Sequence, residues 1–458
     1  MAYDPSHKKE IRGIQSQQGD NDMQKKSLVK VERRLINVLL AVDLIFFLQK
    51  SKKVQTIKEK HARDKRVRKL MKKAYDIPFY HARFDSAGLK PEDFKCAEDL
   101  YKFPLLTKDD LRAWMDEEVG KEQYEDYYLD TTSGSSGTPT RVYYSPKEKA
   151  YNMANWVRVL IRAGYNPVTG LTASRLSAHS VSAGQKNIFQ KLGFLRREFI
   201  NQYAPEPDVI EQINEIKPDL LYMNKTELMR VALYAKKHDI KVHHPKLMVP
   251  TGEMIDDNAR KLFTEIFGDC MIDAYGAAEI GSCMTKYPGS SYWRIQGDLF
   301  AVNICDDLGN EAEEGNLCIT PLYRTDFPLI NYLVGDRARA GKAPDGSRVI
   351  VSVLGRSNDF ISHANGDVTT FFMIAPIFAH SNEIVQVRLV EKSYDDLIIQ
   401  AVASENMTDD EKKAVESRVT EQMNEKLKAP MNISFEWMPV IPPDENGKLR
   451  LIVNEMRK

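Results

Sequence analysis

A run of hydroxyl residues and glycines is the part of this sequence best suited to binding phosphate. Seven Ser/Thr and two Gly occupy the ten positions from Thr131 to Thr140, and the strand-like residues 141–144 follow. Glycine lets backbone N–H groups turn inward and hydroxyls add donors, so the loop can surround a polyphosphate. It is not a Walker A loop, because no Gly-Lys-Ser/Thr closes it. The candidate ligands are Thr132, Ser133, Gly134, Ser135, Ser136, Gly137 and Thr138.

Five further short segments carry residues suited to nucleotide chemistry. Each by itself is typical of an ordinary turn between elements, and a solvated linker has the same composition as the Ser/Gly loop. The interpretation therefore depends on the whole series and on its order along the chain. The segments are residues 251–253, 273–279, 333–336, 354–361 and 442–450.

Composition limits the classes of partner. The 458 residues include 65 Lys/Arg and 65 Asp/Glu, so no nucleic-acid partner is indicated. The charge is uneven, since residues 1–74 hold 20 basic against 8 acidic residues, a net charge of +12. Contact of this segment with a membrane surface is a weaker alternative, because exposed charges are screened within ~8–10 Å at physiological salt. The apolar run from Ile36 to Leu48 is shorter than the ~20 residues of a spanning helix, and we expect it to pack on the protein itself.

The five cysteines have no CxxC spacing. Their odd number and scatter favour a reducing cytoplasm and argue against a zinc site. The N-terminus also lacks the apolar region of a signal peptide, which agrees with a cytoplasmic protein.

The elements that must position the motifs follow an α/β order. Residues 150–270 alternate helical and strand-like segments, which predicts layered sheets with ligands at strand ends. Residues 296–354 are almost purely strand-like. After Gly355 the pattern changes to strands with one amphipathic helix over 409–426, begun by a capping box at Thr408. We expect a basic, partly disordered or helical extension over 1–74, a large domain over 75–355 and a small domain over 356–458.

The motif series, together with residues 77–94 and 105–112, resembles the phenylacetate–CoA ligase-like and CapK/coenzyme F390 synthetase group of adenylate-forming enzymes. The resemblance covers roughly residues 70–450. It implies an α/β fold in which a large ATP- and acid-binding domain of layered sheets and a β-rich subdomain precedes a small, mobile α+β lid. Residues 360–361 and 365–367 look more like the CapK side of this group.

The resemblance assigns the nucleotide site residue by residue. Gly252 and Glu253 would bring a tight turn close to the purine. Tyr275 would stack on adenine, while Gly276 and Ala277 would allow close approach. Glu279 would bind Mg²⁺, and Asp336 would accept both ribose hydroxyls. The family's usual Thr before Glu279 is Ala278 here, so one phosphate contact is missing or comes from Ser282 or the loop.

The resemblance also predicts a hinge and a mobile lysine. Arg356 would reach ribose or phosphate, Asn358 and Asp359 would form the hinge, and Lys448 would offset charge during adenylation. Asn358 replaces the usual hinge carboxylate, and Val334 replaces a usual Thr. Some relatives carry a Cys/His zinc cluster; here Cys283 is kept, but residues near Trp293 replace the histidine, so we predict no zinc.

These assignments imply an ATP-dependent acid ligase that forms an acyl-AMP, releases pyrophosphate and transfers the acyl group to a thiol, that of CoA by resemblance. One alternative is a CapK-type ligase with an amine, hydroxyl or carrier-protein acceptor. A second is a nucleotide-binding protein with weakened turnover, supported by Ala278, Val334 and Asn358. The small carboxylic acid is not identified, although its pocket would include His179, Tyr222 and Asn224. A homodimer is compatible with the resemblance.

Overall fold

The computed structural model of the chain describes residues 55–131, 140–175, 190, 193–201, 204–356, 360–379, 381, 383–403, 407–442 and 449–456. Three short 3₁₀ segments, η1 (Pro91–Asp93), η2 (Ala97–Lys102) and η3 (Glu122–Tyr124), accompany the helices of the described part. Those helices are α2 (Gln55–Tyr75), α3 (Pro78–Ala87), α4 (Lys108–Glu118), α5 (Pro146–Arg162), α7 (Glu206–Ile216), α8 (Lys225–Lys237), α9 (Asp257–Phe267), α10 (Phe371–Ala379) and α11 (Asp409–Lys426).

The largest sheet within the described ranges has seven strands, all paired antiparallel, in the order β10-β11-β12-β13-β9-β8-β7. It confirms the strand-rich character expected for residues 296–354. A separate hairpin pairs β1 (Tyr128–Thr131) with β2 (Arg141–Tyr144). The seven strands are β7 (Asp273–Ala277), β8 (Gly281–Lys286), β9 (Trp293–Ile295), β10 (Phe300–Cys305), β11 (Glu314–Pro321), β12 (Tyr332–Lys342) and β13 (Arg348–Arg356).

Helix α2 packs into the same hydrophobic core as this sheet. Its residues Val67, Leu70, Met71 and Ala74 are 0% exposed and recur at helical spacing, so one face of the helix is apolar. Many of the Lys and Arg residues of this helix lie between these positions, on the opposite face, which is open to solvent. Helix α2 therefore shares a core with residues that follow the domain boundary expected after residue 74.

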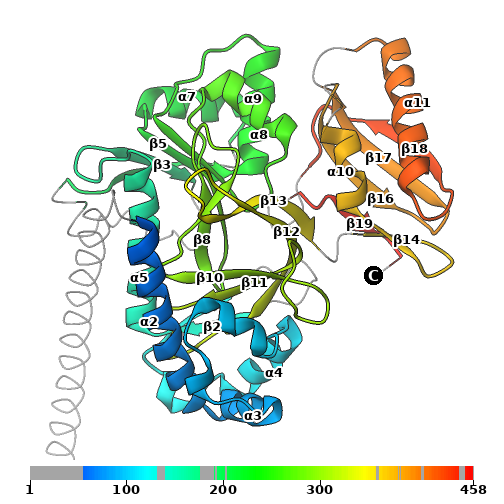
Figure 1. Cartoon of the computed structure of the whole chain (residues 1–458). Coiled ribbons are helices and arrows are strands. Elements are labelled where there is room, and N and C mark those ends of the chain that lie inside the picture. The colour runs from blue at the N-terminus through cyan, green and yellow to red at the C-terminus, as the bar shows by residue number, and fades with distance from the viewer. Residues whose placement is uncertain are drawn as a thin grey trace, which may run out of the picture.

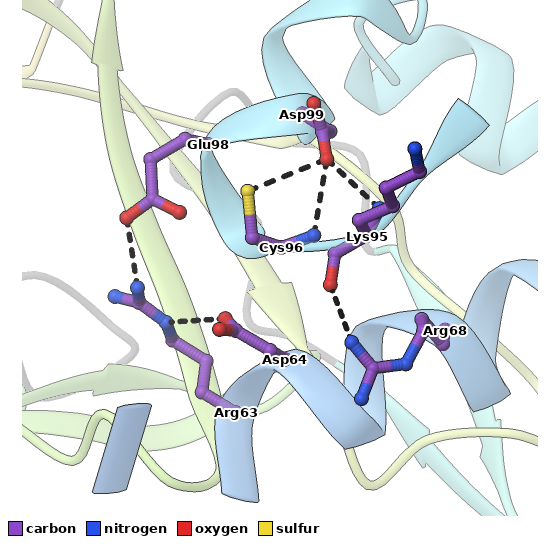
Figure 2. A network of polar contacts seen from close by, with 7 residues as sticks. All are labelled: Arg63, Asp64, Arg68, Lys95, Cys96, Glu98 and Asp99. Atoms are coloured by element: carbon purple, nitrogen blue, oxygen red, sulfur yellow. Dashed lines mark hydrogen bonds and ion pairs between the residues drawn. The ribbon is translucent and has the colours of Figure 1, made fainter. Parts of the chain in front are cut away.

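Polar contacts tie α2 to η2 and to Lys95 before it (Figure 2). Arg63 forms an ion pair with Glu98 at 2.8 Å, and Arg68 donates to the Lys95 carbonyl at 2.8 Å. Asp99 accepts from the N–H groups of Lys95 and Cys96 at 2.8 and 3.0 Å. These bonds satisfy backbone donors at the start of a short helix, where no intrahelical partner exists.

The second sheet is parallel and has the strand order β4-β3-β5-β6. Helices α7, α8 and α9 share a buried apolar cluster with β5 and β6. This arrangement confirms the strand and helix alternation expected for residues 150–270, and it places strand ends next to α8 and α9. The strands are β3 (Leu171–Arg175), β4 (Arg196–Ile200), β5 (Leu220–Asn224) and β6 (Leu247–Thr251).

Residues 360–456, called the C-terminal unit below, have a hydrophobic cluster of their own. Figure 1 shows these elements, coloured orange to red, gathered beside α8 and α9. Thr408 caps α11 as expected, and Val415, Val419 and Met423 of that helix are buried. The four-stranded sheet has the order β18-β17-β16-β19. Its strands, with the hairpin β14–β15, are β14 (Phe360–Ser362), β15 (Val368–Thr370), β16 (Ile384–Glu391), β17 (Asp396–Ala403), β18 (Asn432–Trp437) and β19 (Ile452–Asn454).

Within the ranges given above, none of the helices has the length and apolar character required to cross a membrane. The apolar run from Ile36 to Leu48 lies outside those ranges.

Candidate active site

Tyr275 and Asp336, expected at the adenine and the ribose, lie together. Tyr275 is on β7 and its phenol donates a hydrogen bond to the Asp336 carboxylate on β12. Burial and the charge of Asp336 raise the pKa of Tyr275, so the phenol stays a donor. Asp336 pairs in register with Arg356 across β12 and β13, although the Arg356 side chain lies outside the described residues. Tyr275 and Asp336 thus meet although they are far apart in the sequence and their strands are not neighbours in the sheet.

The close pairing of β7 and β8 requires glycine at position 276. A Cβ atom at Gly276 would lie 2.4 Å from the carbonyl oxygen of Gly281 on β8, which no side chain could tolerate. The close hairpin leaves Gly276 exposed and Ala277 half-buried at the strand end. The expected close approach at these two residues is therefore sterically available.

Glu279 is buried with one carboxylate oxygen unused. The residue is 5% exposed, and its Oε1 accepts a hydrogen bond from Tyr332 Oη at 3.0 Å. Its Oε2 is buried and has no hydrogen-bond partner among the described residues. An ionised carboxylate is costly to bury without a partner, and Mg²⁺ is commonly held by one or two carboxylates plus phosphate oxygens. The geometry of Glu279 therefore fits a magnesium ligand.

Arg324 connects β2 to the Glu279 turn. Its side chain is 0% exposed and donates to the carbonyl oxygens of Glu279 and Tyr143. The guanidinium also lies 4.1 Å from the ring centroid of Tyr144, whose hydroxyl donates to the Ala278 carbonyl at 2.6 Å. Sequence reasoning missed Arg324. The available signal was a charged residue inside the apolar segment 322–330, where burial requires partners.

Helix α4 brings two cations to β12. A Cβ atom on Gly335 would lie 3.3 Å from Lys108 Nζ. Burial and the Glu279 charge raise the pKa of Tyr332, and the nearby Arg112 opposes that shift. The helix begins at a cap, in which the Asp110 N–H donates to Thr107 Oγ1 at 3.1 Å.

The turn after β6 contacts the segment that carries the predicted lysine. Gly252 has φ +89°, a conformation that favours glycine. The carboxylate of Glu253 accepts from Thr226 Oγ1 at 2.7 and 2.9 Å and from the backbone N–H of Leu449. Burial raises the pKa of Glu253, while Lys225 and these hydrogen bonds oppose the rise. Leu449 directly follows Lys448 in the chain.

The two described pocket candidates lie on β5, which pairs with the strand β6 that leads into this turn. Asn224 is 5% exposed at the end of β5, and its Oδ1 accepts from Thr251 Oγ1 at 3.2 Å. Tyr222 packs edge-on against Trp156, with ring centroids 5.9 Å apart. The other candidates lie outside the described residues: Thr132, Ser133, Gly134, Ser135, Ser136, Gly137, Thr138, His179, Asn358, Asp359 and Lys448.

Two further expectations concern Ser282 as a phosphate ligand and the zinc cluster found in some relatives. Ser282, which could supply the phosphate-binding hydroxyl that Ala278 does not have, carries a buried hydroxyl without a partner in the described ranges. The Ser282 carbonyl accepts from Asn155 at 2.6 Å. No cluster of three or more His, Cys, Asp or Glu side chains suitable for a metal occurs within the part of the chain described here. The homodimer and the membrane contact stay predictions.

Known proteins match most of this chain, and a family model matches the C-terminal unit. The family model described as the CapK C-terminal domain matches residues 360–455. A phenylacetate–coenzyme A ligase of Pseudomonas putida is 27% identical over 325 residues, covering 65% of this chain and 70% of that protein. Protein CapK of Staphylococcus aureus is 22% identical over 376 residues, covering 78% of this chain and 81% of that protein.

Among solved structures, 2-hydroxyisobutyryl-CoA ligase is similar in two states. Its postadenylation state with 2-HIB-AMP gives a TM-score of 0.70 at 18% identity, covering 87% of this chain and 90% of that one. Its thioesterification state with 2-HIB-AMP and CoA gives 0.57 at 19% identity, covering 88% and 90%. These likenesses confirm the expected fold class.

Proposed function

This chain is a relative of the phenylacetate–CoA ligase and CapK group of adenylate-forming enzymes, and from that premise we propose that it is an ATP-dependent acid ligase. It forms an acyl-AMP from a small carboxylic acid and ATP, releases pyrophosphate, and transfers the acyl group to the thiol of CoA. The observation that carries the proposal is the buried Oε2 of Glu279, which has no hydrogen-bond partner among the described residues and lies in the turn that follows Tyr275 and β7.

In the first half-reaction the acid's carboxylate oxygen attacks the α-phosphorus, and the bond to the bridging oxygen of pyrophosphate breaks. The loop residues 132–138 would hold the β- and γ-phosphates. Glu279 would hold Mg²⁺, which would supply positive charge to the phosphate oxygens. Lys448 would offset the charge that develops during attack. Tyr332, by donating to Oε1 of Glu279, would orient the carboxylate.

The ribose side of the site requires an exchange of hydrogen bonds. Asp336 accepts the phenol of Tyr275 in this structure. A bound ribose would offer hydroxyl donors to the same carboxylate, and the ring of Tyr275 could then stack on adenine. Gly335 lies on β12 next to Asp336, and the Lys108 ammonium on α4 lies near it. Lys108 would therefore face the nucleotide.

In the second half-reaction a thiolate attacks the acyl carbon and AMP leaves. The C-terminal unit would rotate about Arg356, Asn358 and Asp359, withdrawing Lys448 and admitting the acceptor. The thiol proton would pass to solvent or to a base at the entry path. CoA is the acceptor named for the similar ligases, which is why we assign it here.

The experiment is a screen of aromatic, fatty and small hydroxy acids with Mg-ATP, with pyrophosphate release as the signal. Mass spectrometry of the products with and without CoA then identifies the acceptor. We expect acid-dependent pyrophosphate release and an acyl-CoA product. Absence of acid-dependent release over a broad panel would contradict the proposal.

A second candidate keeps adenylation but uses an amine, hydroxyl or carrier-protein thiol as acceptor. The match of residues 360–455 to the CapK C-terminal domain favours it, because the C-terminal unit faces the acceptor in the second half-reaction of the proposed mechanism. An acyl-AMP that accumulates in the presence of CoA without thioester would support this candidate.

A further inference from the structure

The side chain of Asn258 joins α9 to the C-terminal unit. It is 9% exposed, and its Nδ2 lies 3.0 Å from the Phe378 carbonyl oxygen, 3.1 Å from that of Ser381 and 2.6 Å from that of Ile384. A side-chain amide has two N–H donors, so the three carbonyls share them. Phe378 lies in the last turn of α10, where carbonyl groups lack intrahelical partners. The Phe378 and Ser381 carbonyls also accept from the backbone N–H groups of Ser381 and Ile384, at 3.1 and 3.4 Å, so Asn258 adds a donor from α9 to a turn that already has backbone hydrogen bonds.

A second contact joins the same region to the end of the chain. The carboxylate of Glu253 accepts from the N–H of Leu449. Leu233 of α8 packs against an apolar cluster of the C-terminal unit formed by Val402, Ile441 and Leu449. The C-terminal unit thus rests on both helices by polar and apolar contacts.

Both polar contacts start from residues 252–258, called the docking segment below. The segment begins at the Gly252 turn, where the purine is expected. Between Glu253 and Asn258 the chain is fixed by Asp256, whose carboxylate caps α9 and forms an ion pair with the 5% exposed Lys225 at 2.7 Å. A displacement of the turn would therefore move both contacts together.

We infer that Asn258 is a positioning residue, which holds the C-terminal unit in the pose used for adenylation and has to release it before acyl transfer. This inference rests on the proposed function. It agrees with the closer superposition on the postadenylation state of 2-hydroxyisobutyryl-CoA ligase than on its thioesterification state. Because the docking segment also forms the nucleotide turn, occupancy of that turn would bias how long the pose lasts.

The test measures the two half-reactions separately in Asn258→Ala. Acid-dependent ATP–pyrophosphate exchange reports adenylation, and thioester formation from added acyl-AMP and CoA reports transfer. Since one hydrogen-bonded amide typically changes an equilibrium by up to about tenfold, we expect exchange to fall by about that factor while transfer stays at or above the wild-type rate. Asn258→Asp, which places a carboxylate against carbonyl oxygens, should lower exchange further.

The matched control is Asn214→Ala on α7. Asn214 donates to the Lys241 carbonyl at 3.0 Å and accepts from the His243 N–H at 2.7 Å, both within the parallel-sheet region. It should leave the ratio of the two half-reactions unchanged. An Asn258→Ala protein with unchanged exchange, or with both half-reactions reduced equally, would overturn the inference.

Amide hydrogen exchange gives a readout that needs no substrate. In Asn258→Ala we expect faster exchange for residues 378–391 and for Leu449, by about tenfold at the most affected amides, and no such change in Asn214→Ala. If the wild type adenylates no acid but these amides still respond, the proposed function fails while the docking contact stands. Unchanged amide exchange would show that Asn258 does not hold these residues in place.

Discussion

The nucleotide site and the C-terminal unit are held by different kinds of contact. At the site, two pairs of side chains bind one another, Tyr275 with Asp336 and Tyr332 with Glu279, in addition to the bonds from Arg324 to backbone carbonyls. Where the C-terminal unit contacts the docking segment, side chains of that segment bind backbone groups of the unit, as Asn258 does with three carbonyls. A bond between two side chains demands particular residues on both sides. A bond from a side chain to the backbone demands a particular residue on one side only, and it can be broken and remade without rearranging a core.

The largest effect is expected at the unpartnered oxygen. Glu279→Gln removes the charge that would hold Mg²⁺, and we expect adenylation to fall on the order of 10²–10³-fold, with a higher magnesium requirement. Tyr332→Phe, which removes only the bond to Oε1, is the matched control and should cost far less. Equal losses in the two variants would place the role of Glu279 in structure and not in metal binding.

Arg324→Met tests whether the site depends on buried side-chain bonds. The substitution keeps the volume but leaves the carbonyls of Glu279 and Tyr143 without their donor. We expect the free energy of unfolding to fall by about 2–4 kcal/mol, measured by chemical denaturation. A variant as stable as the wild type would show that these carbonyls find other partners.

Asp336→Asn sharpens the comparison within the site. The amide keeps an acceptor but loses the charge and one acceptor oxygen for the ribose hydroxyls. We expect KM for ATP to rise about tenfold with a smaller change in kcat. Tyr275→Phe frees the carboxylate and should leave KM for ATP nearly unchanged, unless the phenol is needed to orient it. Initial rates at varied ATP separate these outcomes.

The smallest effect concerns the α2 anchor far from the site. Partial burial opposes ionisation of Asp99, but hydrogen bonds from Lys102 and the N–H groups of Lys95 and Cys96 lower its pKa overall. A lowered pKa means that the ionised form stabilises the fold above the unfolded value of about 3.9, and that this contribution is lost as pH falls through the folded pKa. Asp99→Asn should therefore cost about 1 kcal/mol near pH 7, and the difference from wild type should shrink below about pH 4. A difference independent of pH would contradict the charge-based explanation.

A local motif in the sequence can indicate neighbouring site residues and helix starts, and the roles assigned to the site residues stay predictions. Gly276 and Glu279 belong to one short sequence motif, and the predicted cap at Thr408 begins α11 in the structure. Arg324, Tyr332 and Asn258 were missed because their partners lie far away in the chain or are backbone groups, which have no residue signature. Tyr332 could have been predicted, because the period of two along a strand places it on the same face as Asp336.

The central claim is that the C-terminal unit brings Lys448 to the nucleotide held by the large part of the chain. Its most direct test is Lys448→Ala, measured by acid-dependent ATP–pyrophosphate exchange and, separately, by thioester formation from supplied acyl-AMP and CoA. We predict that exchange falls about a hundredfold while transfer from acyl-AMP continues. Exchange at the wild-type rate would contradict the account.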